Sequence, residues 1–197
     1  LHYPLRRQRQ MCIRDRAVAL HGVMRAGLKP GAKVLILGAG AIGLAVAFWA
    51  RRLGAGAVAI TDLGDWQRER ALHLGATHFL VADEVVPGRV EQSLGGPADI
   101  VFECVGRPGL IAQAIDQVRP RGTVVVLGLC TVADSFMPFQ ALSKEVNLVM
   151  SAFFNMDEFC AAVDVLAGPH AGPLTMVSET VTPVSYTHLT LPTKRIV

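Results

Sequence analysis

Val34-Leu35-Ile36-Leu37-Gly38-Ala39-Gly40-Ala41-Ile42-Gly43 is the stretch of sequence that decides the fold of this chain. An apolar run leads directly into three glycines in the pattern Gly-x-Gly-x-x-Gly, and a second apolar run with helical character follows. A buried strand that turns at once into a helix is the setting in which this pattern binds a dinucleotide. The stretch therefore predicts a dinucleotide-binding strand, turn and helix, and an ordinary glycine turn is the alternative.

Each of the three glycines meets a different geometric demand. Gly38 permits the tight turn, Gly40 leaves the backbone open to a diphosphate, and Gly43 lets the helix pack closely on the strand. The helix that begins near Ala41 has free N–H groups and about half a positive charge at its first turn, so an anion binds there readily. We expect this turn to hold the pyrophosphate of a dinucleotide.

Asp62 ends the next apolar run, at the distance where this kind of site places an acid. Its carboxylate is expected to accept hydrogen bonds from the adenosine ribose and to repel a 2′-phosphate. At about 4 Å and an effective dielectric near 20 the repulsion is on the order of 4 kcal/mol per charge pair, an upper figure for a site partly open to water. A fraction of this energy favours NAD over NADP by about tenfold or more. The alternative role for Asp62 is a helix N-cap, and the two roles are compatible.

The two ends of the chain differ in character from the rest. One permitted set of codons for Arg6–Asp15, when reverse-complemented, translates as the sequence of Val184–Thr193. This element resembles a transposon-tag adaptor used in sequencing libraries, so we expect residues 1–16 and 184–197 to be adaptor-derived and disordered. Residues 17–183 are expected to form one NAD-binding domain. A basic tail that binds nucleic acid is the alternative, but it would leave the complementarity of the two ends to chance.

Charge, hydropathy and cysteine usage exclude several classes of partner. The ends contain seven of the 19 Lys and Arg residues and one of the 16 acids, so residues 17–183 are acidic overall and the sequence pI near 8.8 predicts no nucleic-acid partner. No stretch of residues 17–183 is apolar enough to predict a membrane span or a secretory signal. Cys104, Cys130 and Cys160 show no Cys-x-x-Cys spacing, as expected of thiols in a reducing compartment. We expect a cytoplasmic protein.

Strands and helices alternate along residues 17–183. Nearly continuous apolar strands separated by helices are typical of a parallel sheet that is covered on both faces. The sequence therefore predicts an α/β fold with a doubly wound parallel six-stranded sheet, the Rossmann fold. The expected strands are 34–37, 57–61, 78–81, 100–104, 123–127 and 146–150, and the expected helices are 17–28, 41–53, 66–74, one near 91, 110–118 and 157–166.

Ligands of this fold lie across the carboxyl ends of the strands, so residues just after a strand become candidates by position. That position singles out Cys104–Arg107 and Leu127–Cys130. Gly106 and Gly128 are expected to let a cofactor approach the backbone. Simple turn glycines are the alternative.

The strings Ala17–His21, Leu28–Gly43, Leu74–Thr77 and Asp99–Gly106 together resemble the zinc-containing medium-chain alcohol dehydrogenases. The resemblance implies an NAD-binding domain from a longer enzyme that transfers hydride between an alcohol and NAD. By position it implies Gly38, Gly40, Ala41 and Gly43 at the pyrophosphate, Ile42 against the nicotinamide, Asp62 and Leu63 at the adenosine ribose, Val105 and Arg107 at the adenine end, and the backbone of Leu127 and Leu129 at the carboxamide.

The resemblance also implies what residues 17–183 lack. The family's catalytic zinc ligands lie in a domain before Ala17, so zinc and the small-molecule alcohol substrate are expected only of the intact enzyme, and the fragment itself is expected to be inactive. The remaining histidines, His21, His73, His78 and His170, show no metal-ligand spacing, and no catalytic or metal-binding residue is predicted. The apolar segment 146–154 is the kind of edge strand that could pair with a second copy of the chain.

Two other functions fit part of the sequence. One is the zinc-free quinone-reductase branch of the same superfamily, which would favour NADPH, and Asp62 argues against it. The other is a non-catalytic nucleotide-binding module or a methyltransferase with an adenosyl cofactor, neither of which explains a resemblance that extends to Leu129.

Overall fold

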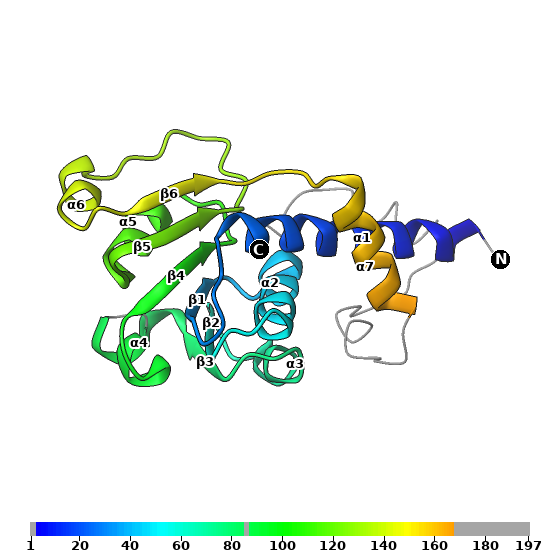
Figure 1. Ribbon diagram of the computed structural model, residues 1–197, viewed down its shortest axis with the longest axis horizontal. Helices are drawn as coiled ribbons and strands as arrows, with labels where there is room; N and C mark the ends of the chain where they lie inside the picture. Colours follow the sequence, from blue (N-terminus) through cyan, green and yellow to red (C-terminus); the bar gives the residue numbers. More distant parts are fainter. Residues whose placement is uncertain (1–2, 85–86, 168–197) are drawn as a thin grey trace.

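The computed structural model describes residues 3–84 and 87–167. Six parallel strands form one sheet in the order β3-β2-β1-β4-β5-β6, with helices on both faces (Figure 1). The predicted doubly wound fold is confirmed. The elements are α1 (Tyr3–Arg25), β1 (Lys33–Leu37), α2 (Ala41–Arg52), β2 (Ala57–Asp62), α3 (Arg68–His73), β3 (His78–Val81), the 3₁₀ turn η1 (Ala82–Glu84), α4 (Pro87–Leu94), β4 (Ala98–Glu103), α5 (Leu110–Gln117), β5 (Val118–Val126), α6 (Pro138–Ser143), β6 (Asn147–Met150) and α7 (Met156–Ala167).

The core lies on both faces of the sheet because successive side chains of a strand point to opposite sides. In β1, Val34 and Ile36 join the cluster under α1, α2 and α7, whereas Leu35 and Leu37 join the cluster under α4 and α5. All four are buried, and full burial of one such side chain contributes about 1.5–3 kcal/mol relative to exposure. This two-sided burial explains why the strands appear in the sequence as continuous apolar runs.

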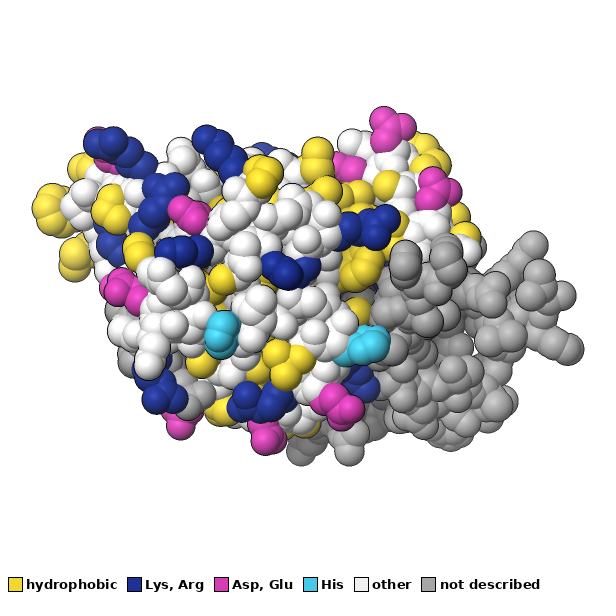
Figure 2. Space-filling view, turned by 60° about the horizontal axis from the view of Figure 1, so that its bottom comes forward, with side chains coloured by type: hydrophobic (Ala, Val, Ile, Leu, Met, Phe, Trp, Pro, Cys, Tyr) yellow, Lys and Arg dark blue, Asp and Glu magenta, His cyan; other side chains and the backbone are white. Residues whose placement is uncertain are grey.

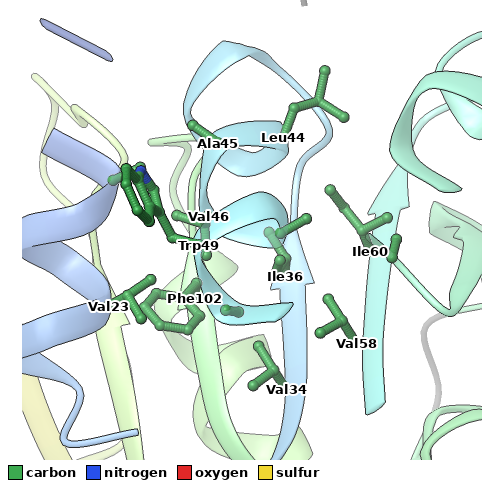
Figure 3. Packing of buried hydrophobic residues seen from close by; sticks show 14 of the residues in the cluster. Val23, Val34, Ile36, Leu44, Ala45, Val46, Trp49, Val58, Ile60 and Phe102 are labelled. Carbon is green, nitrogen blue, oxygen red and sulfur yellow. The ribbon is translucent and has the colours of Figure 1, made fainter. Parts of the chain in front are cut away.

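Trp49 of α2 joins that helix to α1. Figure 3 shows its ring directed toward α1, with Val23 and Phe102 of the same buried cluster close by. Its indole Nε1–H donates to the carbonyl oxygen of Arg16 at 3.0 Å, which satisfies the polar group of a buried ring. The contact fixes the N-terminal helix against the sheet domain.

Over residues 3–16, the described part of the segment 1–16, the structure differs from the expectation of disorder. α1 begins at Tyr3 and continues without a break into the buried residues that follow Arg16. Ile13 packs against the core, and Arg16 is 1% exposed. Once the packed segment nucleates the helix, each added residue gains a backbone hydrogen bond at little further cost. The adaptor origin of this segment stays a prediction, and residues 184–197 lie outside the described residues.

Asp99 ties three strands together at the edge of the sheet where they begin. Its Oδ2 accepts the backbone N–H of Lys33 at 2.8 Å, and its Oδ1 accepts Nε–H of Arg119 at 2.6 Å. Burial would raise the pKa of Asp99, but the hydrogen bonds from Lys33 and Arg119 and their positive charges outweigh it and hold the pKa below its ordinary value. The carboxylate therefore stabilises the fold in its charged form.

Asp99→Asn is expected to lower the free energy of unfolding by about 1–2 kcal/mol at pH 7, because a charge-assisted hydrogen bond is lost at a partly exposed position. A carboxyl whose pKa is lowered by folding contributes stability above its unfolded pKa of about 3.9 and loses it as the pH falls through the folded pKa. The difference from wild type should therefore shrink in acid. Urea unfolding at pH 7 and pH 3 measures the loss of stability and its decrease in acid. Glu91→Gln, at an exposed position, is the control. Equal stability of Asp99→Asn and the wild type at pH 7 would contradict this account.

Candidate cofactor-binding site

The glycine turn lies at the carboxyl end of β1, beside the point where the strand order reverses between β1 and β4. Gly38 has φ +96°, a left-handed conformation that disfavours every residue with a Cβ. A Cβ there would also lie 2.6 Å from Cγ2 of Val105. The turn itself therefore requires glycine at position 38, as predicted.

Gly43 and Gly40 differ in the space that their surroundings leave for a side chain. Gly43 is buried in the first turn of α2, and a Cβ there would overlap the carbonyl oxygen of Gly38 and lie 3.0 Å from its carbon. Gly40 is exposed, and a Cβ there would meet nothing within 4 Å. The fold therefore requires Gly43 but places no steric demand of its own on position 40.

The N-terminus of α2 carries no competing group. Gly40 is the N-cap and makes no side-chain hydrogen bond, and the first turn contains no acidic residue. The N–H groups of Ala41 and Ile42 belong to the turn that has no intrahelical acceptor. The helix dipole adds about half a positive charge at this end, so the site suits an anionic group.

Asp62 is the last residue of β2 and lies next to the glycine turn. β1 and β2 pair in parallel with Leu37 opposite Thr61, so Gly38 and Asp62 follow at the same level. Asp62 Oδ1 accepts the backbone N–H of Leu63 at 2.7 Å, which leaves Oδ2 for other donors. The alternative role of Asp62 as a helix N-cap is wrong, because α3 begins at Arg68.

Exposed apolar side chains surround the same edge of the sheet. Leu63 is 64% exposed after β2, Val105 is 41% exposed after β4, and Leu129 is 85% exposed after β5. Arg107 is also exposed, in the loop that follows β4. These four predicted residues thus lie at strand ends, as the fold requires of residues that contact a ligand.

Leu127 follows β5 with one backbone group already engaged. Its N–H donates to the carbonyl oxygen of Glu103 at 2.8 Å, and the N–H of Gly128 donates to the same oxygen at 2.9 Å. Of the two backbone groups of Leu127, only the carbonyl oxygen is therefore left to contact a ligand. If Leu127 orients the carboxamide, as the resemblance implies, it must do so as a hydrogen-bond acceptor.

Glu103 shapes the site, and the sequence analysis missed it. The side chain is 1% exposed at the end of β4, and its Oε1 accepts the backbone N–H groups of Val105 and Gly106, both at 2.8 Å. Together with its carbonyl oxygen, Glu103 thus joins the loops after β4 and β5. The available signal was an acid at the end of an otherwise apolar strand, directly before Cys-Val-Gly.

Gly106 and Gly128 serve the contact between these two loops. A Cβ on Gly106 would lie 2.5 Å from the backbone nitrogen of Leu129, and a Cβ on Gly128 would overlap the backbone nitrogen of Gly106. Gly106 also has φ +76°. The neighbouring loop fills the space that a Cβ would take, so the contact between the loops by itself accounts for glycine at both positions. The approach of a cofactor to their backbone stays a prediction.

Cys104 lies between Glu103 and Val105 with its thiol enclosed. Burial, and secondarily the negative charge of Glu103, raise the pKa of the Cys104 thiol well above its ordinary value. The thiol stays protonated at neutral pH, which disfavours roles as a nucleophile or a metal ligand.

The described residues do not fit the zinc of the family that the sequence resembles. Within residues 3–84 and 87–167, no three His, Cys, Asp or Glu side chains come together in a group that could hold a metal. His21 is instead paired with Glu158 at 2.9 Å, which joins α1 to α7. His170 lies outside the described residues. No helix in the described part of the chain is long and apolar enough to cross a membrane.

Comparison with known proteins agrees with this geometry. The sequence model of the zinc-binding dehydrogenases matches residues 41–168. Sorbitol dehydrogenase 1 of Saccharomyces cerevisiae is 31% identical over 165 residues, which are 79% of this chain and 46% of that protein. The chain thus spans about half the length of the curated relatives it matches.

Two solved structures show the same arrangement. The 2R,3R-butanediol dehydrogenase of Bacillus subtilis superposes with a TM-score of 0.74 at 26% identity, covering 82% of this chain and 47% of that one. A zinc-binding dehydrogenase of Sinorhizobium meliloti, solved with NADP, has a TM-score of 0.70 at 28% identity and covers 85% of this chain and 48% of that one.

Proposed function

The chain belongs to the zinc-binding dehydrogenases, within the zinc-containing medium-chain alcohol dehydrogenase family, and from that premise we propose that it is the NAD-binding part of an alcohol or polyol dehydrogenase. The intact enzyme would transfer hydride between a small alcohol and the nicotinamide. The described residues offer no group for zinc, so the proposal for this chain concerns cofactor binding alone.

Gly40 is the observation that carries this proposal. The protein's own packing explains the glycines at 38 and 43, whereas a side chain at 40 would meet only solvent. A glycine that the fold does not need, at the uncapped N-terminus of α2, is explained by an anionic group that must approach the backbone. The pyrophosphate of a dinucleotide is such a group.

The remaining roles follow from position. We propose that Asp62 and Leu63 contact the adenosine ribose, that Val105 and Arg107 lie at the adenine end, and that Ile42 lies against the nicotinamide. The Leu127 carbonyl and the Leu129 backbone would orient the carboxamide. Leu63, Val105 and Leu129 support this placement, because flat rings laid on them would cover apolar surface that is otherwise exposed.

NAD, rather than NADP, is proposed from the carboxylate of Asp62 beside the turn. We expect the chain to bind NADH at least about tenfold more tightly than NADPH, since a 2′-phosphate would meet a like charge. Asp62→Ser should remove most of that difference. Calorimetric titration of the wild type and of Asp62→Ser with NADH and with NADPH measures the difference in affinity.

Asp65→Ser is the matched control, because Asp65 is an exposed acid of the same loop and its loss changes the net charge equally. The control should keep the preference of the wild type. Tighter binding of NADPH by the wild-type chain would contradict the choice of NAD and favour the zinc-free quinone-reductase branch. No binding of either cofactor would contradict the proposal as a whole.

Three further points rest on the sequence. We propose that residues 17–183 form the functional domain, that the protein is cytoplasmic, and that it forms a homo-oligomer. The homo-oligomer is supported by the edge strand β6, whose last residue Met150 is 57% exposed, and by Phe153 shortly after it, which is 81% exposed.

A further inference from the structure

A cavity lies at the opposite edge of the sheet from the glycine turn, where the strands begin. Its volume is about 460 Å³, and its walls come from the 26–32 loop after α1 and from the first residues of β4, β5 and β6. This volume is within the range of small-molecule sites, about 300–1,000 Å³. None of the residues assigned to the cofactor contributes to it.

The walls of this cavity are basic although residues 17–183 as a whole are acidic. Lys29, Arg119 and Arg121 line it, and the only acid among the lining residues is Asp99. In Figure 2, Lys and Arg side chains gather at the upper left of the visible face, on the side where β5 and β6 begin in Figure 1. The cavity therefore favours an anion.

Two of the three cations are available to a ligand. Arg119 is held by Asp99 through the 2.6 Å contact of its Nε. Lys29, in contrast, pairs with no carboxylate of the described residues. The pair between Arg121 and Glu145 is 2.8 Å long, but its side chains are 80% and 68% exposed, so solvent screens it strongly.

The backbone conformation of Arg121 independently indicates a functional role for its side chain. Arg121 has φ +56°, a left-handed conformation that is strained for a residue with a Cβ and free of strain for glycine. Its N–H donates to the carbonyl oxygen of Lys144 at 2.7 Å, which holds the conformation. Strained residues of this kind are concentrated at functional sites.

We propose that this cavity binds the phosphate group of a small phosphate ester, with Lys29 and Arg121 supplying the charges. Thr123 and Asn147, which pair across β5 and β6 and line the same cavity, supply a hydroxyl and an amide for the phosphate oxygens. A volume of about 460 Å³ exceeds what a bare phosphate needs, which leaves room for the organic part of an ester.

Titration of the ¹⁵N-labelled chain with glycerol 3-phosphate, and separately with inorganic phosphate, tests this proposal. We expect amide shifts at Gly27, Gly31 and Thr123, with tighter binding of the ester. The amides of Gly40 and Ile42 report separately on the glycine turn, so this result does not depend on whether NAD binds. Tighter binding of malonate than of either phosphate compound would overturn the phosphate assignment.

Arg121→Gly and Lys29→Gln identify the groups responsible. Arg121→Gly removes the charge and the strained φ together, so glycine is the replacement that the backbone at this position tolerates best. Urea unfolding of the variant checks that it is folded. We expect each variant to raise the dissociation constant by about tenfold or more, as for a lost charged hydrogen bond. Arg70→Gln on α3 removes the same charge away from the cavity and should bind as the wild type does. Unshifted cavity amides, or Arg121→Gly that binds like Arg70→Gln, would overturn the proposal.

Discussion

Gly40→Val is expected to weaken NAD binding by at least about a hundredfold, which corresponds to about 2.7 kcal/mol. The valine side chain would occupy the space above the first turn of α2, where a Cβ meets no protein atom within 4 Å. A pyrophosphate could then no longer reach the N–H groups of that turn. Because nothing in the protein is displaced, the free energy of unfolding should fall by no more than about 1 kcal/mol, the cost of a poorer N-cap.

Calorimetry with NADH and urea unfolding of the same preparation measure the two effects together. Gly40→Ala adds a single methyl group and should lose less affinity than Gly40→Val, with a similar loss of stability of no more than about 1 kcal/mol because alanine is also a poorer N-cap. A graded loss of binding would show that the space above position 40 belongs to the ligand. Unchanged affinity of Gly40→Val would contradict the placement of the pyrophosphate at this turn.

Gly43→Ala is expected to have the opposite profile, with a net loss of about 1–2 kcal/mol in the free energy of unfolding. The added methyl group would overlap the carbonyl oxygen of Gly38, so α2 must move away from β1. Overpacking of this kind costs about 1–3 kcal/mol or more, and it opposes the gain of up to about 1 kcal/mol that alanine brings to a helix. NAD binding should fall as a consequence of the displaced helix.

Gly88→Ala provides the matched control for this variant. Gly88 lies in α4, and a Cβ there would meet nothing within 4 Å. Only the helix gain applies, so we expect urea unfolding to show a slight stabilisation. If Gly43→Ala were as stable as Gly88→Ala, the close packing of α2 on β1 would not be the reason for glycine at position 43.

The order of strands and helices, apart from the short helix α6 that the sequence analysis did not predict, could be predicted because it depends on local patterns. The run Val34–Leu37 and the glycines after it predicted β1, its turn and α2, since periodicity and steric limits on φ act within a few residues. Asp62 could be located in the same way, by its distance from the turn. The N-cap alternative failed because the loop after β2 continues to Arg68 before a helix begins, and no local pattern marked that length.

The contacts between loops could not be predicted in this way. Glu103 meets Val105 and Gly106 nearby, but it also meets Leu127 and Gly128 through its carbonyl oxygen, and those residues are distant in sequence. The contact that Gly106 and Gly128 make between these loops was therefore not apparent when each was considered in its own turn. The helical state of residues 3–16 likewise depends on packing at Ile13 and Arg16 against α2 and the core.

By itself, the sequence determined the fold, the glycine turn and the acid beside it, because each is encoded by neighbouring residues whose sterics and polarity act locally. Only the tertiary structure decided which glycine the packing requires and which faces open space, because that depends on what lies opposite each Cβ. The basic cavity also depends on the tertiary structure, because Lys29, Arg121 and Asn147 line one cavity only when three separate segments pack at one edge of the sheet.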